Sequence, residues 1–168
     1  MQENPMRQIK IEKVTLNIGC GSDQQKIERA KKLLEILTEI KPVVTQSHKR
    51  STFGVPEGEP IGAKVTLRKD SAEKFFKKVL EAVDNKIRSS QLDERGNISI
   101  GIKEYIDLPG IKYKHEVGML GFDCAVTLQR AGYRIKYRRI QQKDIPPKHQ
   151  INKEEVVNWL KQQGVTVE

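Results

Sequence analysis

The sequence has few of the residues that most catalytic, metal-binding or disulfide-linked proteins depend on. Its 168 residues include 2 cysteines, 3 histidines and 1 tryptophan, and only 5% are aromatic. Cys20 and Cys124 lie in glycine-rich or apolar strand patterns. One disulfide could join them, but buried free thiols in a reducing cytosol are expected. The histidines, at 48, 115 and 149, have no cysteine or carboxylate at the spacing of metal ligands, so no metal or other cofactor is expected.

Long hydrophobic runs are also missing. No stretch approaches the ~20 apolar residues that span a bilayer, and the first seven residues lack the apolar segment of a secretory signal. A cytoplasmic protein without a membrane partner is therefore expected. Positive charge, in contrast, is in excess, with 31 Lys and Arg against 22 Asp and Glu and a formal net charge of +9. Such a surplus favours a polyanionic partner such as nucleic acid.

Three helices are predicted. An apolar stripe from Ile27 to Ile40 follows the possible caps Ser22 and Asp23, and Pro42 ends this first helix. A second helix begins at Asp70, with Glu73 as its capping-box partner and a core face that extends from 75 to 87. Asn152 and Glu155 cap a short last helix, which is closed by Gly164.

Alternating apolar and polar residues predict strands at 10–18, 64–68, 98–102 and 122–128, and a short strand from residue 43. Strands and helices interleave without a strict βαβ rhythm. We therefore predict an α+β fold with a mostly antiparallel sheet, helices packed on one face, and the other face partly open for RNA. Residues 1–130 would form a single RNA-binding domain, and residues 131–168 a basic arm and a short C-terminal helix.

A long loop at 46–62 interrupts this domain. Glycines at 54, 58 and 62 and prolines at 56 and 60 predict that residues 51–62 have no regular structure. Long loops in compact domains are often functional, and Phe53 could stack on a base or a sugar. A merely flexible loop is the other interpretation. The basic arm has the same two interpretations, and its partner would be RNA or protein.

The polar faces of two strands carry the most informative pattern. Val14, Leu16 and Ile18, with Val65 and Leu67, would face the core. Because successive strand side chains point to opposite faces, a polar set would face outward: Lys13, Thr15, Asn17, Lys64, Thr66 and Arg68. If both strands share one sheet, these side chains form a field of hydrogen-bond donors and positive charge. Such a field suits phosphates, sugar hydroxyls and the shallow minor groove of RNA.

One motif suggests an enzyme instead. Asn17-Ile-Gly-Cys-Gly-Ser ends a strand in Gly-x-Gly before a helix, as phosphate and nucleoside sites do, and it looks like the glycine motif of S-adenosylmethionine-dependent methyltransferases. An acidic residue usually stands where this chain has Asn17, and a third glycine where it has Asp23. A methyltransferase-like enzyme is the alternative function, and a tight strand-to-helix turn is the simpler interpretation.

Four motifs resemble one protein family: Val14-Thr-Leu-Asn-Ile-Gly, Lys41-Pro-Val-Val-Thr, Pro60-Ile-Gly-Ala-Lys-Val-Thr-Leu-Arg and Gly96-Asn-Ile-Ser-Ile-Gly-Ile-Lys-Glu. In this order, between residues 9 and about 130, they are similar to the L-five family of large-subunit ribosomal proteins that carry 5S rRNA. Lys148-His-Gln-Ile-Asn-Lys-Glu-Glu and Trp159 resemble archaeal and eukaryotic members and not bacterial ones.

The resemblance implies a non-catalytic protein of the central protuberance, in the cytoplasmic large ribosomal subunit. Its implied partners are 5S rRNA, large-subunit rRNA, P-site tRNA, a protein of the small-subunit head and a neighbouring 5S rRNA-binding ribosomal protein. The segment 105–120 would face the small subunit. The implied 5S rRNA contacts are Lys13, Thr15, Asn17, Thr45, Gln46, Lys64, Thr66 and Arg68.

The resemblance also implies a loop that contacts tRNA, made of Lys49, Arg50, Ser51, Thr52, Phe53 and Gly54. Bacterial relatives are more basic in this loop, whereas this chain has Glu57 and Glu59. We therefore expect any tRNA contact to come from Lys49, Arg50 and Phe53.

Overall fold

A five-stranded sheet forms the centre of the computed structural model, which describes residues 4–50 and 54–167. Its strands are β1 (Lys10–Gly19), β2 (Val43–Gln46), β3 (Pro60–Leu67), β5 (Asn97–Ile102) and β6 (Phe122–Gln129). Their order across the sheet is β2-β3-β1-β6-β5, and every neighbouring pair is antiparallel. The predicted α+β fold with an antiparallel sheet is therefore confirmed.

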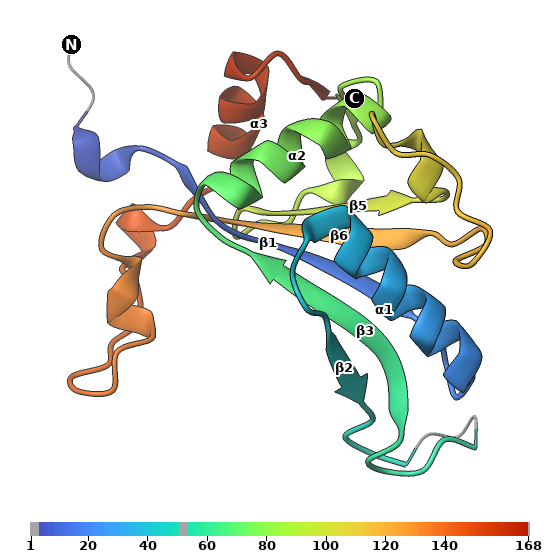
Figure 1. Cartoon of the computed structure of the whole chain (residues 1–168). Coiled ribbons are helices and arrows are strands. Elements are labelled where there is room, and N and C mark those ends of the chain that lie inside the picture. The colour runs from blue at the N-terminus through green and yellow to red at the C-terminus, as the bar shows by residue number, and fades with distance from the viewer. Residues whose placement is uncertain (1–3, 51–53, 168) are drawn as a thin grey trace.

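Three helices lie on one side of this sheet, α1 (Gln24–Thr38), α2 (Asp70–Ala82) and α3 (Lys153–Gln162), with α3 beside α2 (Figure 1). The core lies between sheet and helices. Val14, Leu16 and Ile18 of β1 are buried there with Val65 and Leu67 of β3, as their alternation predicts. Burial of this apolar surface supplies the main driving force for the layered arrangement.

The helix ends follow from local capping. Asp23 is the N-cap residue of α1, and its carboxylate accepts hydrogen bonds from the backbone N–H groups of Gln25 and Lys26 at 3.0 and 3.2 Å. The helix ends at Thr38, so the prediction that Ile40 belongs to it is wrong. Glu39 takes a left-handed conformation there, with φ 58°.

The second helix begins at Asp70, as predicted, but it lacks the predicted capping box. Lys69 is its N-cap residue, with φ 56° and no side-chain capping bond, and Asp70 lies inside the first turn. Acidic residues in that turn still favour the helix through its dipole. The prediction that Ile87 belongs to this helix is wrong. Ile87 lies on the short strand β4 (Lys86–Ile87), which pairs in parallel with β7 (Thr166–Val167).

The C-terminal helix packs into the same core as the sheet. The backbone N–H of Asn152 donates to the Glu155 carboxylate at 3.1 Å, which confirms the predicted capping box. Val156 and Leu160 are fully buried, and the Trp159 ring stacks on Phe76 of α2 with centroids 6.2 Å apart. The division of the chain at residue 130 stays a prediction.

The predicted loop is shorter than 46–62. Pro60, Ile61 and Gly62 belong to β3, and Pro60 pairs with Gln46. The prediction that Pro60 excludes regular structure is wrong because the first residue of a strand needs no backbone donor. Five short 3₁₀ turns complete the described structure, at 5–7, 89–91, 105–107, 133–136 and 147–149. In the described parts of the chain, no helix has the length and apolar character needed to cross a membrane.

Candidate nucleic-acid interface

The polar residues of β1 and β3 lie side by side on the sheet face opposite the helices, which we call the open face. In the antiparallel register, Thr15 is opposite Thr66 and Asn17 is opposite Lys64. Residues directly opposite in such a pair point to the same face, with Cβ atoms about 5 Å apart. The two strands thus share one sheet, and their predicted outward side chains form a single surface. Asn17, Lys64 and Thr66 are exposed, and Thr15 is half-buried.

Two further strands extend the open face. Asp123 is opposite Asn17, and Ala125 is opposite Thr15. Gly101 and Ser99 of β5 continue these two rows across β6. Sequence reasoning used the alternation of β5 and β6 only to find core residues, and missed their outward residues. Because these residues are small, apart from Asp123, the β6 and β5 side of the open face can be approached closely by a flat or convex ligand.

The edge strand β2 contributes Thr45 and Gln46. Thr45 pairs with Gly62, and a bulge after Thr45 lets Gln46 pair with Pro60. Gly62 is required here by close packing. A Cβ atom at this position would overlap the carbonyl oxygen of Ile18 and come within 3.1 Å of Thr45 Oγ1. The predicted contacts Thr45 and Gln46 therefore lie at one end of the open face, where the backbones pack tightly.

An acidic residue that sequence reasoning did not consider lies at the opposite end. A bulge in β1 between Ile11 and Lys13 gives Glu12 no partner on β6. Its carboxylate lies 3.8 Å from Nη1 of Arg68, and the Glu12 side chain is only 12% exposed. Lys13 pairs with Thr127 beside it. Glu12 therefore holds Arg68 at the rim of the open face and offsets part of its charge.

The chemistry of the open face is that of recognition. It offers hydroxyl, amide, ammonium and guanidinium groups, with Glu12 and Asp123 as its acids. Within residues 4–50 and 54–167, no group of three or more His, Cys, Asp or Glu side chains is placed to hold a metal ion. Cys124 is on the buried side of the sheet, and burial raises the pKa of its thiol to about 12, so it is not a nucleophile.

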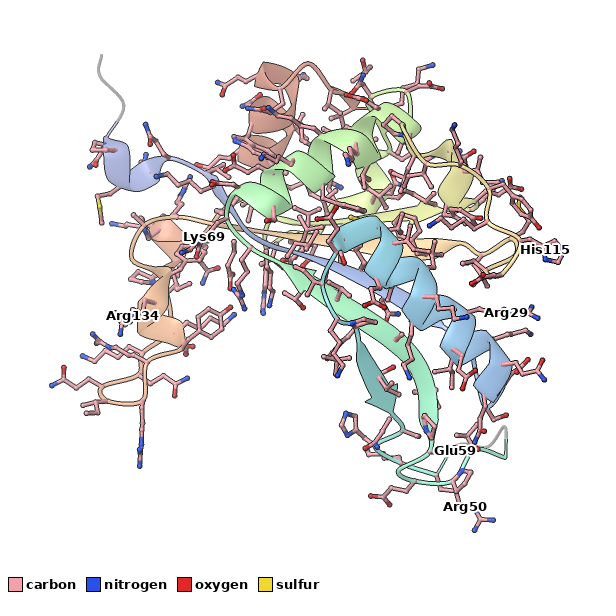
Figure 2. All side chains as sticks on the ribbon, viewed as in Figure 1. Arg29, Arg50, Glu59, Lys69, His115 and Arg134 are labelled. Carbon is pink, nitrogen blue, oxygen red and sulfur yellow. The ribbon has the colours of Figure 1, made fainter. Side chains whose placement is uncertain are left out.

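The β2–β3 hairpin carries the predicted tRNA-contacting loop away from the sheet (Figure 1). Its stem continues past the strands, because Ser47 N–H donates to the Glu59 carbonyl and Gly58 N–H to the Ser47 carbonyl, both at 2.9 Å. Lys49 and Arg50 are exposed, and Figure 2 shows Arg50 and Glu59 at the same end of the molecule. Gly54 has φ 82°, which favours glycine. Ser51, Thr52 and Phe53 lie outside the described residues.

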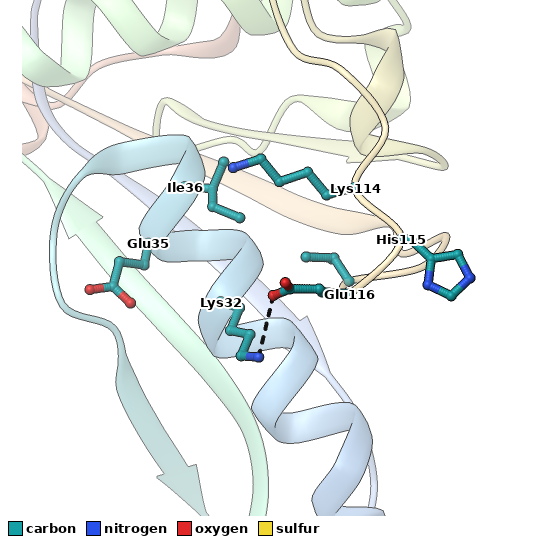
Figure 3. Close-up of a pocket in the computed structure, with 7 residues that line it drawn as sticks. Lys32, Glu35, Ile36, Lys114, His115 and Glu116 are labelled. Atoms are coloured by element: carbon teal, nitrogen blue, oxygen red, sulfur yellow. Dashed lines mark ion pairs between the residues drawn. The ribbon is translucent and has the colours of Figure 1, made fainter.

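The segment 105–120 folds back on the body of the protein. Tyr105 is buried, and its hydroxyl accepts a hydrogen bond from the Lys114 N–H at 2.9 Å. A hollow between this segment and α1 is lined by Lys32, Ile36, Lys114, His115 and neighbouring residues (Figure 3). The Lys32 ammonium pairs with Glu116 at 3.6 Å across it. Tyr113 and Met119 are about half exposed.

Comparison with known proteins identifies the family. The family model described as Ribosomal protein L5 matches residues 4–55, and the model of the ribosomal L5P family C-terminus matches residues 60–159. The chain belongs to the ribosomal protein L5 family. This confirms the family resemblance of the four motifs and the prediction of a ribosomal protein, not an enzyme.

Its relatives include curated proteins named Large ribosomal subunit protein uL5. One from Sulfurisphaera tokodaii is 47% identical over 161 residues, which cover 95% of this chain and 91% of the relative. One from Nanoarchaeum equitans is 47% identical over 168 residues, covering 98% and 99%. One from Methanosphaera stadtmanae is 43% identical over 167 residues, covering 98% and 99%. These relatives are archaeal, as the C-terminal motif implied.

The methyltransferase alternative is wrong. Gly19 is not at the end of a parallel strand facing a cofactor crevice, because it pairs with Gly62 on an antiparallel neighbour. Dinucleotide-type sites depend on a parallel sheet that leaves a crevice at the carboxyl ends of its strands. The Gly-x-Gly sequence instead makes the tight turn into α1, with Gly21 at φ 65°.

Proposed function

We propose that the chain is a structural component of the large ribosomal subunit in the cytoplasm, and that its open face binds 5S rRNA and attaches it in the central protuberance. The curated relatives named above are large-subunit proteins, which supports this setting. The proposed 5S rRNA contacts are Lys13, Thr15, Asn17, Thr45, Gln46, Lys64, Thr66 and Arg68. Large-subunit rRNA and a neighbouring 5S rRNA-binding protein would complete its surroundings.

One observation carries this proposal. The register that pairs Thr15 with Thr66 and Asn17 with Lys64 joins the predicted contacts into one continuous surface on the uncovered side of the sheet. Hydroxyl and amide groups in fixed rows can bond 2′-hydroxyls and phosphate oxygens, and Lys64 adds charge. The small residues of β5 and β6 beside them leave room for a helical RNA backbone.

A charge reversal on the open face tests the proposal. Lys64→Glu should weaken binding to an archaeal 5S rRNA transcript by more than tenfold, because it replaces one attraction to phosphate by a repulsion. Lys78→Glu on α2 makes the same change of charge at an exposed site on the helix side. Equal loss for the two variants, with folding intact by circular dichroism, would mean that only net charge matters and that the open face is not the site.

We also propose that the loop at the end of the β2–β3 hairpin contacts P-site tRNA. Lys49 and Arg50 are exposed there, while Glu57 and Glu59 limit the positive charge. Replacing both basic residues by glutamine should reduce protection of the P-site tRNA elbow in reconstituted ribosomes and leave 5S rRNA binding within twofold. Unchanged tRNA protection would contradict the contact.

The segment 105–120 is our proposed contact with the small-subunit head. Its exposed Tyr113 and Met119 give it an apolar surface, and the buried Tyr105 holds its backbone in place. Tyr113→Ala with Met119→Ala should weaken association of the two subunits without affecting 5S rRNA binding. If association measured by light scattering is unchanged, this segment does not form the bridge.

A further inference from the structure

Residues 131–150, which we call the arm, carry an unusual concentration of positive charge. Six basic side chains, Arg134, Lys136, Arg138, Arg139, Lys143 and Lys148, accompany a single acid, Asp144. None of the six forms an ion pair with another described residue. The arm leaves the end of β6 and projects from the body at a different end from the β2–β3 hairpin (Figure 1). Figure 2 shows Arg134 on it, far from Arg50.

The base of the arm is clamped. Arg130, whose side chain is 4% exposed, donates from Nη1 to the carbonyls of His149 and Gln150 at 3.3 and 3.2 Å. Its Nη2 lies 2.7 Å from the Glu155 carboxylate of α3. The Tyr133 hydroxyl donates to the His149 carbonyl at 3.2 Å and accepts from the Ile151 N–H at 3.1 Å. Both ends of the arm are therefore fixed to each other and to the core.

The outer part of the arm is also organised by hydrogen bonds. Arg138 Nε donates to the Gln141 carbonyl at 2.9 Å, and the Gln142 side chain donates to the Lys136 carbonyl at 2.7 Å. Its exposed apolar side chains are Tyr137 and Ile140. A backbone that is ordered in this way has less loop entropy to lose on binding.

The arm faces the open face across a hollow. Glu12, Asn97 and Thr127 line the sheet side of this hollow with the neighbouring Asp93 and Arg95, and Lys136, Tyr137 and Asp144 line the arm side. Thr127 pairs with Lys13, and Glu12 pairs with Arg68, so the sheet side of the hollow is continuous with the proposed 5S rRNA contacts. A ligand that covers the Lys13 and Arg68 end of the open face would therefore meet the arm.

We propose that the arm is a second RNA-binding surface, and that its cations contact the phosphate backbone of the same RNA that lies on the open face. This inference rests on the proposed 5S rRNA binding. RNA fits better than an acidic protein, because protein interfaces have cores with few charges, whereas the arm has many charges and two exposed apolar side chains. The contacts of Arg130 fix the orientation of the arm relative to the open face.

The test compares two triple variants of equal charge. Arg134→Gln, Arg139→Gln and Lys143→Gln change the arm without removing a side-chain hydrogen bond of its described structure. Lys74→Gln, Lys77→Gln and Lys78→Gln change exposed positions of α2 on the helix side. Each is titrated against an archaeal 5S rRNA transcript, and against an unrelated structured RNA of equal length, over a range of salt concentrations.

For the arm variant we expect the slope of log affinity against log salt to fall by about 2–3, since each phosphate contact contributes ~0.7–0.9. Hydroxyl-radical footprinting should show that one protected RNA segment is lost while another is kept. The α2 variant should keep the wild-type slope.

The two proposals fail in different ways. If the wild-type protein prefers 5S rRNA but the arm and α2 variants behave alike, the arm does not bind this RNA, and its charge would serve an acidic protein instead. If the wild-type protein shows no preference for 5S rRNA, the proposed function itself is contradicted and this inference falls with it.

Discussion

Thr15 and Thr66 lie directly opposite each other on β1 and β3, on the face of the sheet that looks away from the three helices. Two short hydroxyl side chains at the centre of a sheet face are a small feature. The register that pairs them also places Asn17 opposite Lys64 on one side and leaves Lys13 and Arg68 towards the other end. The proposed RNA-binding surface depends on this register.

Arg68 is the first residue to test individually. Arg68→Ala should weaken 5S rRNA binding by about 1–3 kcal/mol, the usual range for one charged contact. Its ion pair with Glu12 is long, at 3.8 Å, and the Arg68 side chain is 60% exposed, so the variant should still fold, which circular dichroism checks. Affinity is measured by filter binding at fixed salt. An unchanged affinity in a folded variant would remove Arg68 from the site.

Gly62 tests the close packing at the other end of the open face. Gly62→Ala should destabilise the protein by about 1–3 kcal/mol, because the new Cβ overlaps the Ile18 carbonyl on β1. Gly101→Ala is the matched control, since its Cβ would meet no atom nearer than 3.6 Å. Urea unfolding compares the two variants, and a similar midpoint for both would show that β1 and β3 can separate without cost.

The clamp on Arg130 predicts a pH dependence of stability. Burial raises the pKa of Glu155, but hydrogen bonds from Arg130 and the Asn152 N–H, with the Arg130 charge, outweigh it and hold the pKa below its ordinary value of 4.5. Stability from the ionised carboxylate is therefore complete above pH 4.5 and is lost as the pH falls through the lower, folded-state value.

Glu155→Gln should accordingly reduce the free energy of unfolding by about 1–3 kcal/mol at pH 7, because it leaves the buried guanidinium without its counter-charge. The difference from wild type should shrink in acid. Glu154→Gln, at the exposed neighbouring position, should have little effect at either pH. A difference that persists at low pH would show that the charge of Glu155 is not what stabilises the clamp.

The two thiols should react very differently. Cys124 is fully buried, with its pKa raised to about 12, while Cys20 is partly exposed. Burial also raises the pKa of Cys20, and the nearby Asp23 adds to this, so its reaction should be slow but measurable. A disulfide reagent should therefore modify one thiol per native chain and two after unfolding. Rapid modification of both in the native protein would contradict the burial of the β6 core face.

The core and the open face were predictable from sequence because strand alternation is a local pattern. The same alternation that buried Val14, Leu16 and Ile18 placed Thr15 and Asn17 on the other side. Asp123, Ala125 and Ser99 were missed although they obey the same rule, because small or acidic residues did not suggest RNA contact. Their place became clear only through the strand order, which sequence alone did not give.

Features that depend on distant contacts were not predictable. Nothing local marks Arg130 as a buried side chain, since its partners His149, Gln150 and Glu155 come about twenty residues later. Pro60 seemed to exclude a strand, but pairing with Gln46 places it at a strand end where proline is tolerated. The burial of Arg130 and the strand position of Pro60 depend on tertiary contacts, which a local sequence pattern does not contain.

The most direct measurement is a titration of the wild-type protein with an archaeal 5S rRNA transcript and with an unrelated structured RNA of equal length, at two salt concentrations. We expect tighter binding to 5S rRNA at both concentrations and a marked loss of affinity at the higher one. Equal affinity for the two RNAs would contradict this expectation, because the open face would then be only a basic surface without selectivity for its proposed partner.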